Sequence, residues 1–298
     1  MNARTYRLYL PALLALLTFG CVMGERHVET ITRSWPADGI KRVDVNGIDG
    51  SVDVTAGTGN EISLVAHVRS RNFQPDPKKE NKGYFVTAVD GDTLTIGRQH
   101  GVRIRGPFFF FSTHDVEINY ELRVPPTVDL ALKTVNGRVA TRGTDGGIQA
   151  TTVNGSLDVE ASGEREVSLH TVNGPVEAHF TKDFQGAHFK TVNGSVRAVL
   201  PPTASFACVL SQVNGDFEAA FPLTIHSHPG SRRVSGEVNG GRYDLNIVTV
   251  NGDIKIENAM PPAPPVPPGA PGAAPSVVPS PPSAPVAPAA PPAPNSTE

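Results

Sequence analysis

Two closely spaced histidines, in the segment His226-Ser-His228-Pro-Gly230, are the first candidate metal ligands. A zinc site takes three or four ligands, which are oriented by further hydrogen bonds. No third ligand stands nearby in the sequence, and the other histidines do not fall at equivalent places in the repeat described below. We therefore interpret this segment as a loop, and we predict neither a bound metal nor a cofactor.

Carboxylates and an arginine recur at one place in the same repeat, and such a set could act on a saccharide. A β-helix that cleaves polysaccharides carries clustered carboxylates with Arg or Lys on one face. Here the few charged residues of the column include both acidic and basic side chains. Surface ion pairs, each worth at most about 1 kcal/mol, explain this column better than a catalytic site does. The sequence also lacks a nucleophile elbow, a P-loop and a metalloprotease motif, so we predict no catalytic residue. The column consists of Asp158, Glu177, Arg197 and Glu218.

A third candidate is the aromatic run Gly106-Pro-Phe-Phe-Phe-Phe-Ser112. Four consecutive aromatic side chains cannot all face inward from one strand, and exposed apolar clusters mark contact surfaces. Two interpretations remain open. The aromatic side chains cover one open end of the core, which we favour, or they form a contact patch whose neighbouring arginines hold an anionic partner. This patch consists of Arg103, Arg105, Phe108, Phe109, Phe110 and Phe111.

A repeat positions most of these residues. The triplet Val-Asn-Gly occurs seven times in the second half of the chain, and an eighth copy lies at Asn46. Successive asparagines are 18, 19, 20, 21, 25 and 12 residues apart, and a period near 20 is typical of stacked repeats. We predict that these asparagines form a ladder of repeat turns: Asn136, Asn154, Asn173, Asn193, Asn214, Asn239 and Asn251.

Apolar and polar residues alternate with period two on both sides of each Asn-Gly, as in Leu157-Asp-Val159 after Asn154. This pattern predicts two short, half-buried strands in each period. Cys208 falls in an inward column, where it should act as a small apolar residue.

Two architectures have two strands per period: an antiparallel meander with Asn-Gly hairpins, and a β-solenoid in which each period is one coil. The meander needs only Asn-Gly, but Thr-Val precedes it at five of the copies. Identity at one position across many periods favours stacked side-chain ladders. We therefore predict an all-β, β-helix-like solenoid of about 20-residue coils over residues 28–258, with a less regular β-rich N-terminal part.

The two ends of the chain differ from this repeat. Residues 1–20 combine two arginines with an apolar run, which predicts a secretory signal peptide, followed by a linker over residues 21–27. Cys21 follows Gly20 as at a lipoprotein cleavage site, and ordinary secretion with cleavage at Gly20 or Gly24 is the alternative. Residues 259–298 are rich in Pro and Ala, which predicts a disordered, extended tail that is either a spacer or a tolerated end.

Composition excludes some classes of function. The formal net charge of −3 leaves no basic field, which argues against nucleic-acid binding. Of the two cysteines, one lies at the end of the signal segment. An internal disulfide is therefore not expected, and stability must come from a packed core.

Several segments resemble the bacterial putative-adhesin domain family of unknown function. They are Val116-Glu-Ile-Asn-Tyr-Glu-Leu-Arg-Val-Pro125, Leu130-Ala-Leu-Lys-Thr-Val-Asn-Gly137, the serial Thr-Val-Asn-Gly coils and the last coils from Ser235 to Ile256. The resemblance covers roughly Val43 to Glu257. It implies a cell-envelope β-solenoid without an assigned catalytic site. The aromatic run, the His226 segment and the Pro-rich tail depart from the family pattern.

Together these observations predict a non-enzymatic, exported protein of the cell envelope, periplasmic or on the outer surface. Its rigid solenoid would serve as a structural or adhesin-like binding module for a protein or polysaccharide ligand, with the membrane reached through a lipid on Cys21. Two alternatives are a saccharide-acting β-helix enzyme and a periplasmic partner of an envelope-stress or transport system.

Overall fold

The computed structural model describes residues 26–71, 78, 80–98, 115–223, 226–227 and 233–259. The chain divides into two units, Met1–Met260 and Pro261–Glu298, and every described residue belongs to the first. The predicted signal peptide, the lipidation site Cys21 and the Pro-rich tail after Ala259 lie outside the described residues. The patch from Arg103 to Phe111 also lies outside them.

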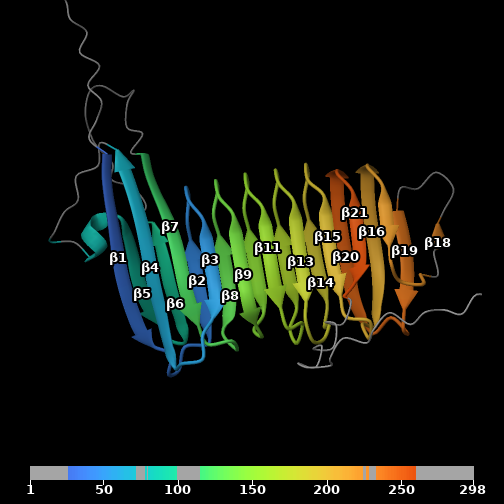
Figure 1. The fold of residues 1–298 in the computed structure, drawn as a ribbon, viewed down its shortest axis with the longest axis horizontal. Helices are drawn as coiled ribbons and strands as arrows, with labels where there is room; N and C mark the ends of the chain where they lie inside the picture. Colours follow the sequence, from blue (N-terminus) through green and yellow to red (C-terminus); the bar gives the residue numbers. More distant parts are fainter. Residues whose placement is uncertain are drawn as a thin grey trace, which may run out of the picture. The chain divides into compact units, whose positions relative to one another are not determined.

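The described part consists of two β-sheets that face each other across one apolar core (Figure 1). Sheet A has ten strands, in the spatial order β1 (Arg26–Pro36), β4 (Glu61–Arg71), β7 (Asp115–Val124), β3 (Val52–Ala56), β9 (Val139–Thr144), β11 (Leu157–Ala161), β13 (Val176–Phe180), β15 (Val196–Leu200), β21 (Ile254–Asn258) and β17 (Phe217–Ala219).

Sheet B has eleven strands. Their spatial order is β18 (His226–Ser227), β19 (Arg233–Val238), β16 (Phe206–Asn214), β20 (Tyr243–Asn251), β14 (Ala187–Lys190), β12 (Val167–His170), β10 (Ile148–Thr151), β8 (Asp129–Lys133), β2 (Arg42–Asn46), β6 (Thr93–Arg98) and β5 (Phe85–Asp90). A short 3₁₀ helix, η1 (Glu80–Gly83), precedes β5.

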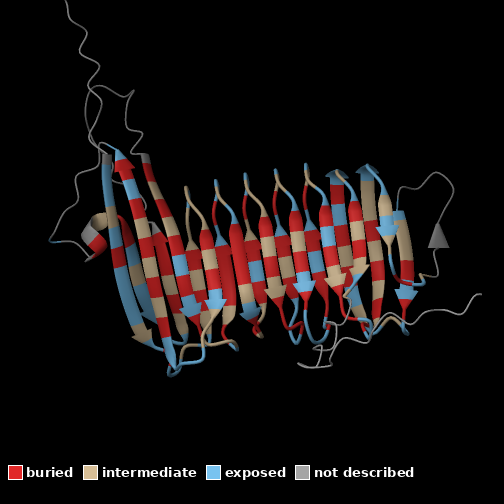
Figure 2. Cartoon of the chain, viewed as in Figure 1, coloured by how far each residue is buried: buried red, intermediate tan, exposed pale blue. Residues whose placement is uncertain are grey.

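Each coil contributes one strand to each sheet, and the coils stack with parallel strands. In the coil β10–β11, Ile148 and Ala150 are buried from one side and Leu157 and Val159 from the other. Figure 2 shows this alternation along both sheets, and the buried residues form one continuous cluster. Because burying a Val, Leu or Ile side chain stabilises by about 1.5–3 kcal/mol, this shared core supplies the main stability of coils that cannot fold singly.

The spatial order of the coils departs from their order in the sequence at both ends. The coil β2–β3 lies between β6–β7 and β8–β9. The coil β20–β21 lies between β14–β15 and β16–β17. Antiparallel strands are confined to the ends, where β1 and β4 extend sheet A and β5, β18 and β19 border sheet B.

The predicted β-solenoid is therefore confirmed, and so is the less regular N-terminal part. The predicted loop at His226 is wrong for this residue, because His226 and Ser227 form the short strand β18. His228 lies outside the described residues. Cys208 is buried in β16, and burial raises the pKa of its thiol.

Candidate functional site: the asparagine edge

The turns that carry Thr-Val-Asn-Gly line up along one narrow edge of the solenoid, which we call the asparagine edge. The threonine of each motif is buried, and its hydroxyl donates to the carbonyl oxygen of the glycine one coil earlier in the stack. Thr152, for example, donates to Gly137 at 3.1 Å and Thr171 donates to Gly155 at 3.0 Å. Thr134, Thr191 and Thr249 repeat this bond at 3.1 to 3.2 Å. The threonine is thus required to satisfy a backbone acceptor.

The glycine of each motif is required by close approach of neighbouring turns. A Cβ on Gly155 would overlap the carbonyl oxygen of Gly137, and one on Gly194 would overlap the carbonyl oxygen of Gly174. The same overlap with the carbonyl oxygen of the neighbouring glycine recurs at Gly137, Gly174 and Gly252.

The asparagine side chains form a continuous hydrogen-bonded ladder. Each amide Nδ2 donates to the side-chain oxygen of the preceding coil, over distances of 2.7 to 2.9 Å. The spatial order is Asp49, Asn136, Asn154, Asn173, Asn193, Asn251 and Asn214. Asp49 suits the first place because a carboxylate accepts but has no N–H to donate. At the usual spacing of neighbouring strands, these seven positions span about 29 Å.

Two asparagines of the sequence motif do not belong to this ladder. Asn239 lies at the turn between β19 and β20 with a positive φ of 50°, and its Nδ2 donates to the carbonyl oxygen of Ala204 at 2.8 Å. Its predicted place in the ladder is therefore wrong. The early copy at Asn46 also misses the ladder, because it lies in β2 opposite Lys133. Asp49, three residues later, takes the equivalent place.

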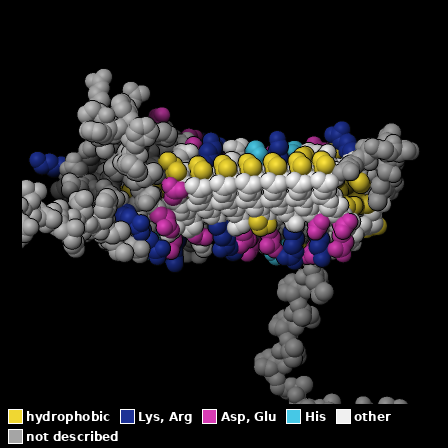
Figure 3. Space-filling model, turned by 90° about the horizontal axis from the view of Figure 1, so that it is seen from above, with side chains coloured by type: hydrophobic (Ala, Val, Ile, Leu, Met, Phe, Trp, Pro, Cys, Tyr) yellow, Lys and Arg dark blue, Asp and Glu magenta, His cyan; other side chains and the backbone are white. Residues whose placement is uncertain are grey.

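The valine of each motif also faces outward, but its apolar side chain takes no part in the ladder. The resulting row lies beside the asparagine ladder, and Figure 3 shows it as a line of hydrophobic side chains next to an uncharged band. Five of its members are 37% to 48% exposed. We call this row the aliphatic rail: Ile48, Val135, Val153, Val172, Val192, Val250 and Val213.

Ion pairs between neighbouring coils cover the outer face of sheet A. Arg142 binds Asp158 through two contacts of 2.7 and 3.2 Å, and Arg138 also pairs with Asp158. Partial burial alone would raise the pKa of Asp158, but the hydrogen bonds from Arg142 and Arg138 outweigh it and hold this pKa below its usual value. The charges of these two coils are therefore paired with one another.

The predicted column of charges is interrupted. Arg197 pairs with Glu177 on one side and with Glu257 at 2.7 Å, but Glu218 is not on the next coil. The inserted β21 places Lys255 between Arg197 and Glu218, and Lys255 pairs with Glu218 at 3.5 Å. Hydrogen bonds from Arg197 and then Lys255 lower the pKa of Glu257.

The described residues contain no group of three His, Cys, Asp or Glu side chains placed to hold a metal ion. Over the same part of the chain, no helix has the length and apolar character needed to cross a membrane. The candidate site is therefore the asparagine edge, a flat array of amide and aliphatic side chains. The sequence revealed the ladder through its motif, and a signal for the outward valines was also present, because the alternation that buries Leu132 and Thr134 turns Val135 outward.

Parallel coils, a shared core and an internal amide ladder define this protein as a two-sheet β-solenoid of stacked repeats. The chain belongs to the Toastrack DUF4097 family, whose model matches residues 39–257. This assignment confirms the resemblance seen in the repeats. No functionally curated protein matches the chain in sequence.

Solved structures with a similar backbone share little sequence with this chain. A putative cell adhesion protein from Clostridium sporogenes is 10% identical, with a TM-score of 0.44 over 78% of this chain and 100% of that chain. A putative adhesin from Bacteroides fragilis is 14% identical, with a TM-score of 0.30 over 78% and 97%. A putative lipid binding protein from Parabacteroides distasonis is 13% identical, with a TM-score of 0.28 over 78% and 97%. Neither the family description nor these names refer to an enzyme.

Proposed function

We propose that this chain is a non-enzymatic, exported protein of the cell envelope and that its solenoid is a binding module. The binding surface is the asparagine edge, and its ligand is an extended, uncharged polysaccharide. The observation that carries this proposal is the aliphatic rail. Threonine, asparagine and glycine each have a structural task inside the stack, whereas the valine has no such bond to explain its exposure.

The fold itself requires valine at this position less strictly than it requires the threonine, asparagine and glycine of the motif. A β-branched residue suits extended backbone, but threonine is also β-branched and would be better solvated at an exposed place. All seven rail positions carry Val or Ile, and none carries a polar residue. Contiguous apolar side chains on a surface are typical of contact sites.

The ladder amides supply the polar half of the surface. Each interior amide uses one N–H and one oxygen lone pair within the ladder, so a second N–H and a second lone pair remain for a ligand. Sugar hydroxyl groups can use both, while the aliphatic rail contacts the apolar faces of the rings. Because the turns repeat rigidly, the surface is ordered before binding and loses little conformational entropy.

Co-sedimentation of the purified full chain with three insoluble uncharged polymers, cellulose, chitin and β-mannan, tests this proposal. We expect binding to at least one of these polymers, and we expect Val153→Glu combined with Val192→Glu to abolish it, since the two carboxylates would have to be desolvated at the contact. The matched control is Gln149→Glu combined with His170→Glu, at exposed positions of sheet B. The control should bind normally.

Equal binding by the rail variant, with an unchanged thermal unfolding midpoint, would remove the asparagine edge as the binding surface. If the chain bound none of the three polymers, a polysaccharide ligand would be ruled out.

Export and attachment through Cys21 belong to the same proposal. Mass measurement of the mature N-terminus is expected to give a chain that begins at Cys21 and carries lipid. Cys21→Ser should move the protein from the membrane fraction to the soluble fraction. An unmodified Cys21, or a first residue other than Cys21, would rule out the lipid anchor.

A further inference from the structure

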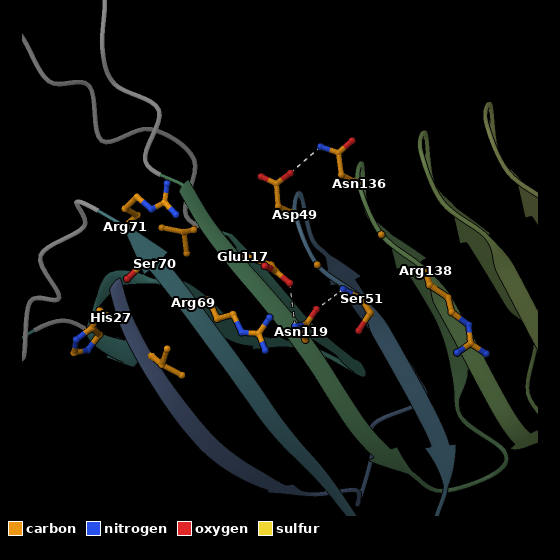
Figure 4. A pocket seen from close by; sticks show the side chains of 14 residues that line it. His27, Asp49, Ser51, Arg69, Ser70, Arg71, Glu117, Asn119, Asn136 and Arg138 are labelled. Atoms are coloured by element: carbon orange, nitrogen blue, oxygen red, sulfur yellow. Dashed lines mark hydrogen bonds between the residues drawn. The ribbon is translucent and has the colours of Figure 1, made fainter. Parts of the chain in front are cut away.

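A groove next to the first rung of the ladder is a second candidate site, separate from the aliphatic rail. Its volume is about 780 Å³, which is within the usual range for pockets that bind small molecules. Residues from β1, β4 and β7 line it, together with the turns that precede β3 and β9 (Figure 4). Asp49 and Asn136 stand at its border, where their side chains form the first bond of the ladder.

The groove contains positive charge that the described residues do not compensate. Arg69 and Arg71 are two residues apart on β4, so they point to the same face of sheet A. Both are exposed, and within the described part neither guanidinium group makes a hydrogen bond or an ion pair. Arg69 lies opposite Glu117 in the β4–β7 register without forming an ion pair. Arg138, the third arginine of the groove, pairs with Asp158.

The two acidic side chains of the groove accept hydrogen bonds from asparagine amides and do not pair with Arg69 or Arg71. Asp49 accepts the hydrogen bond from Asn136 at 2.7 Å. Glu117 accepts one from Asn119 at 3.3 Å, and Asn119 in turn accepts the backbone N–H of Ser51 at 2.8 Å. This chain of bonds holds a carboxylate and an amide at the floor of the groove (Figure 4). Such groups bind hydroxyls, while guanidinium groups bind carboxylates and phosphates.

Ser70 lies between the two arginines in the sequence and is only 4% exposed. Because side chains alternate along a strand, Ser70 points to the opposite face of sheet A, toward the core, and takes no part in holding a ligand beside Arg69 and Arg71.

We infer that this groove binds an anionic saccharide, meaning a sugar that bears a carboxylate or phosphate group. Arg69 and Arg71 hold the anionic group, and Glu117 and Asn119 hold ring hydroxyls. This inference goes beyond the proposed function and does not depend on it, because the aliphatic rail contributes no residue to these contacts.

Isothermal titration calorimetry of the full chain at low ionic strength tests the inference with three probes: trigalacturonate, glucose 6-phosphate and the neutral disaccharide cellobiose. We expect at least one anionic probe to bind and cellobiose to give no heat under the same conditions. Arg69→Gln combined with Arg71→Gln should lower the affinity for the anionic probe at least about tenfold, since it removes two charge-assisted contacts. The carboxylate and phosphate arms show which anion is preferred.

The matched control is Arg33→Gln combined with Arg123→Gln, which removes the same charge from exposed positions of sheet A outside the groove. It should keep the parent affinity. A parent chain that binds neither anionic probe, or binds cellobiose equally well, would overturn the inference. Equal losses in both double variants would also overturn it, because they would reflect net charge alone. The rail variant, Val153→Glu with Val192→Glu, should bind the anionic probe normally. The test of the groove is therefore independent of the test of the aliphatic rail.

Discussion

The middle coils and the terminal coils of this solenoid are equivalent in geometry but different in connectivity. From β8 to β15, each coil stacks on the one before it in the sequence, and neighbouring ladder residues are 18 to 20 positions apart. Near each end of the stack, one coil lies between two coils that follow each other in the sequence: β2–β3 at one end and β20–β21 at the other. There the neighbouring ladder residues are 87, 58 and 37 positions apart. The hydrogen bonds between the ladder side chains are nevertheless of similar length throughout the stack.

This difference shows that the motif determines how a coil fits the stack, but not where along the stack it lies. It also has a consequence for the ends of the repeat. The inserted strands β3 and β21 have neighbours on both sides, so neither becomes an edge of its sheet. In sheet A the last edge strand is the three-residue β17. Short edges limit pairing with other chains.

Glycine at the ladder turn should be the most sensitive position in the comparison. Gly155→Ala places a Cβ against the carbonyl oxygen of Gly137 and should lower the free energy of unfolding by about 3 kcal/mol. Gly59→Ala, near the N-terminal end, meets no atom within 4 Å and should change it by less than about 0.5 kcal/mol. Urea unfolding measures both. Equal stability of the two variants would contradict close stacking of the turns.

Threonine tests whether middle and inserted coils are equivalent in energy. Thr171→Val removes the donor to Gly155 within the middle coils, and Thr249→Val removes the donor to Gly194 at the inserted coil. Each substitution leaves a carbonyl oxygen without this donor and should cost about 1.5 kcal/mol. Equal losses in urea unfolding would support equivalence. A much smaller loss for Thr249→Val would mean that the inserted coil is held less firmly.

The Asp158 ion pair should give the smallest effect, and one that depends on pH. Its folded-state pKa is lowered, so its contribution is present above the unfolded-state value of about 3.9 and is lost as the pH falls through the folded-state pKa. Asp158→Asn should therefore cost about 0.5–1 kcal/mol at pH 7 and progressively less below pH ~3.9. The control Asp90→Asn, at an exposed position of β5, should be neutral. A pH-independent loss for Asp158→Asn would contradict the ion pair.

Sequence reasoning predicted what local patterns determine. Alternation around Asn154-Gly155 gave two strands per coil and the correct inward columns, because burial alternates with period two. Identity of the threonine and the asparagine pointed to stacking, since a hairpin does not need them.

The order of the coils could not be read from the same patterns. Two motif copies look alike in sequence whether they stack at adjacent or distant places, as Asn193 and Asn251 show. One signal was present: the spacings of 25 and 12 around Asn239 break the period, and Asn239 is the copy that leaves the ladder. Asp49 escaped notice because the ladder tolerates an acceptor without the Asn-Gly motif. The groove could not be predicted from the sequence, because its residues come from three strands and two turns that lie far apart in the chain.

Disulfide trapping tests the in-register, out-of-sequence ladder most directly. Pairs of cysteines on the aliphatic rail would be introduced into a chain with Cys21→Ser and Cys208→Ala. Adjacent rungs lie about 4.8 Å apart, within the Cα separation that a disulfide spans, whereas rungs two places apart do not. The structure predicts rapid oxidation of the pair Val192→Cys and Val250→Cys, and little for Val192→Cys with Val213→Cys. The reverse pattern would show that coils stack in sequence order and would contradict this account.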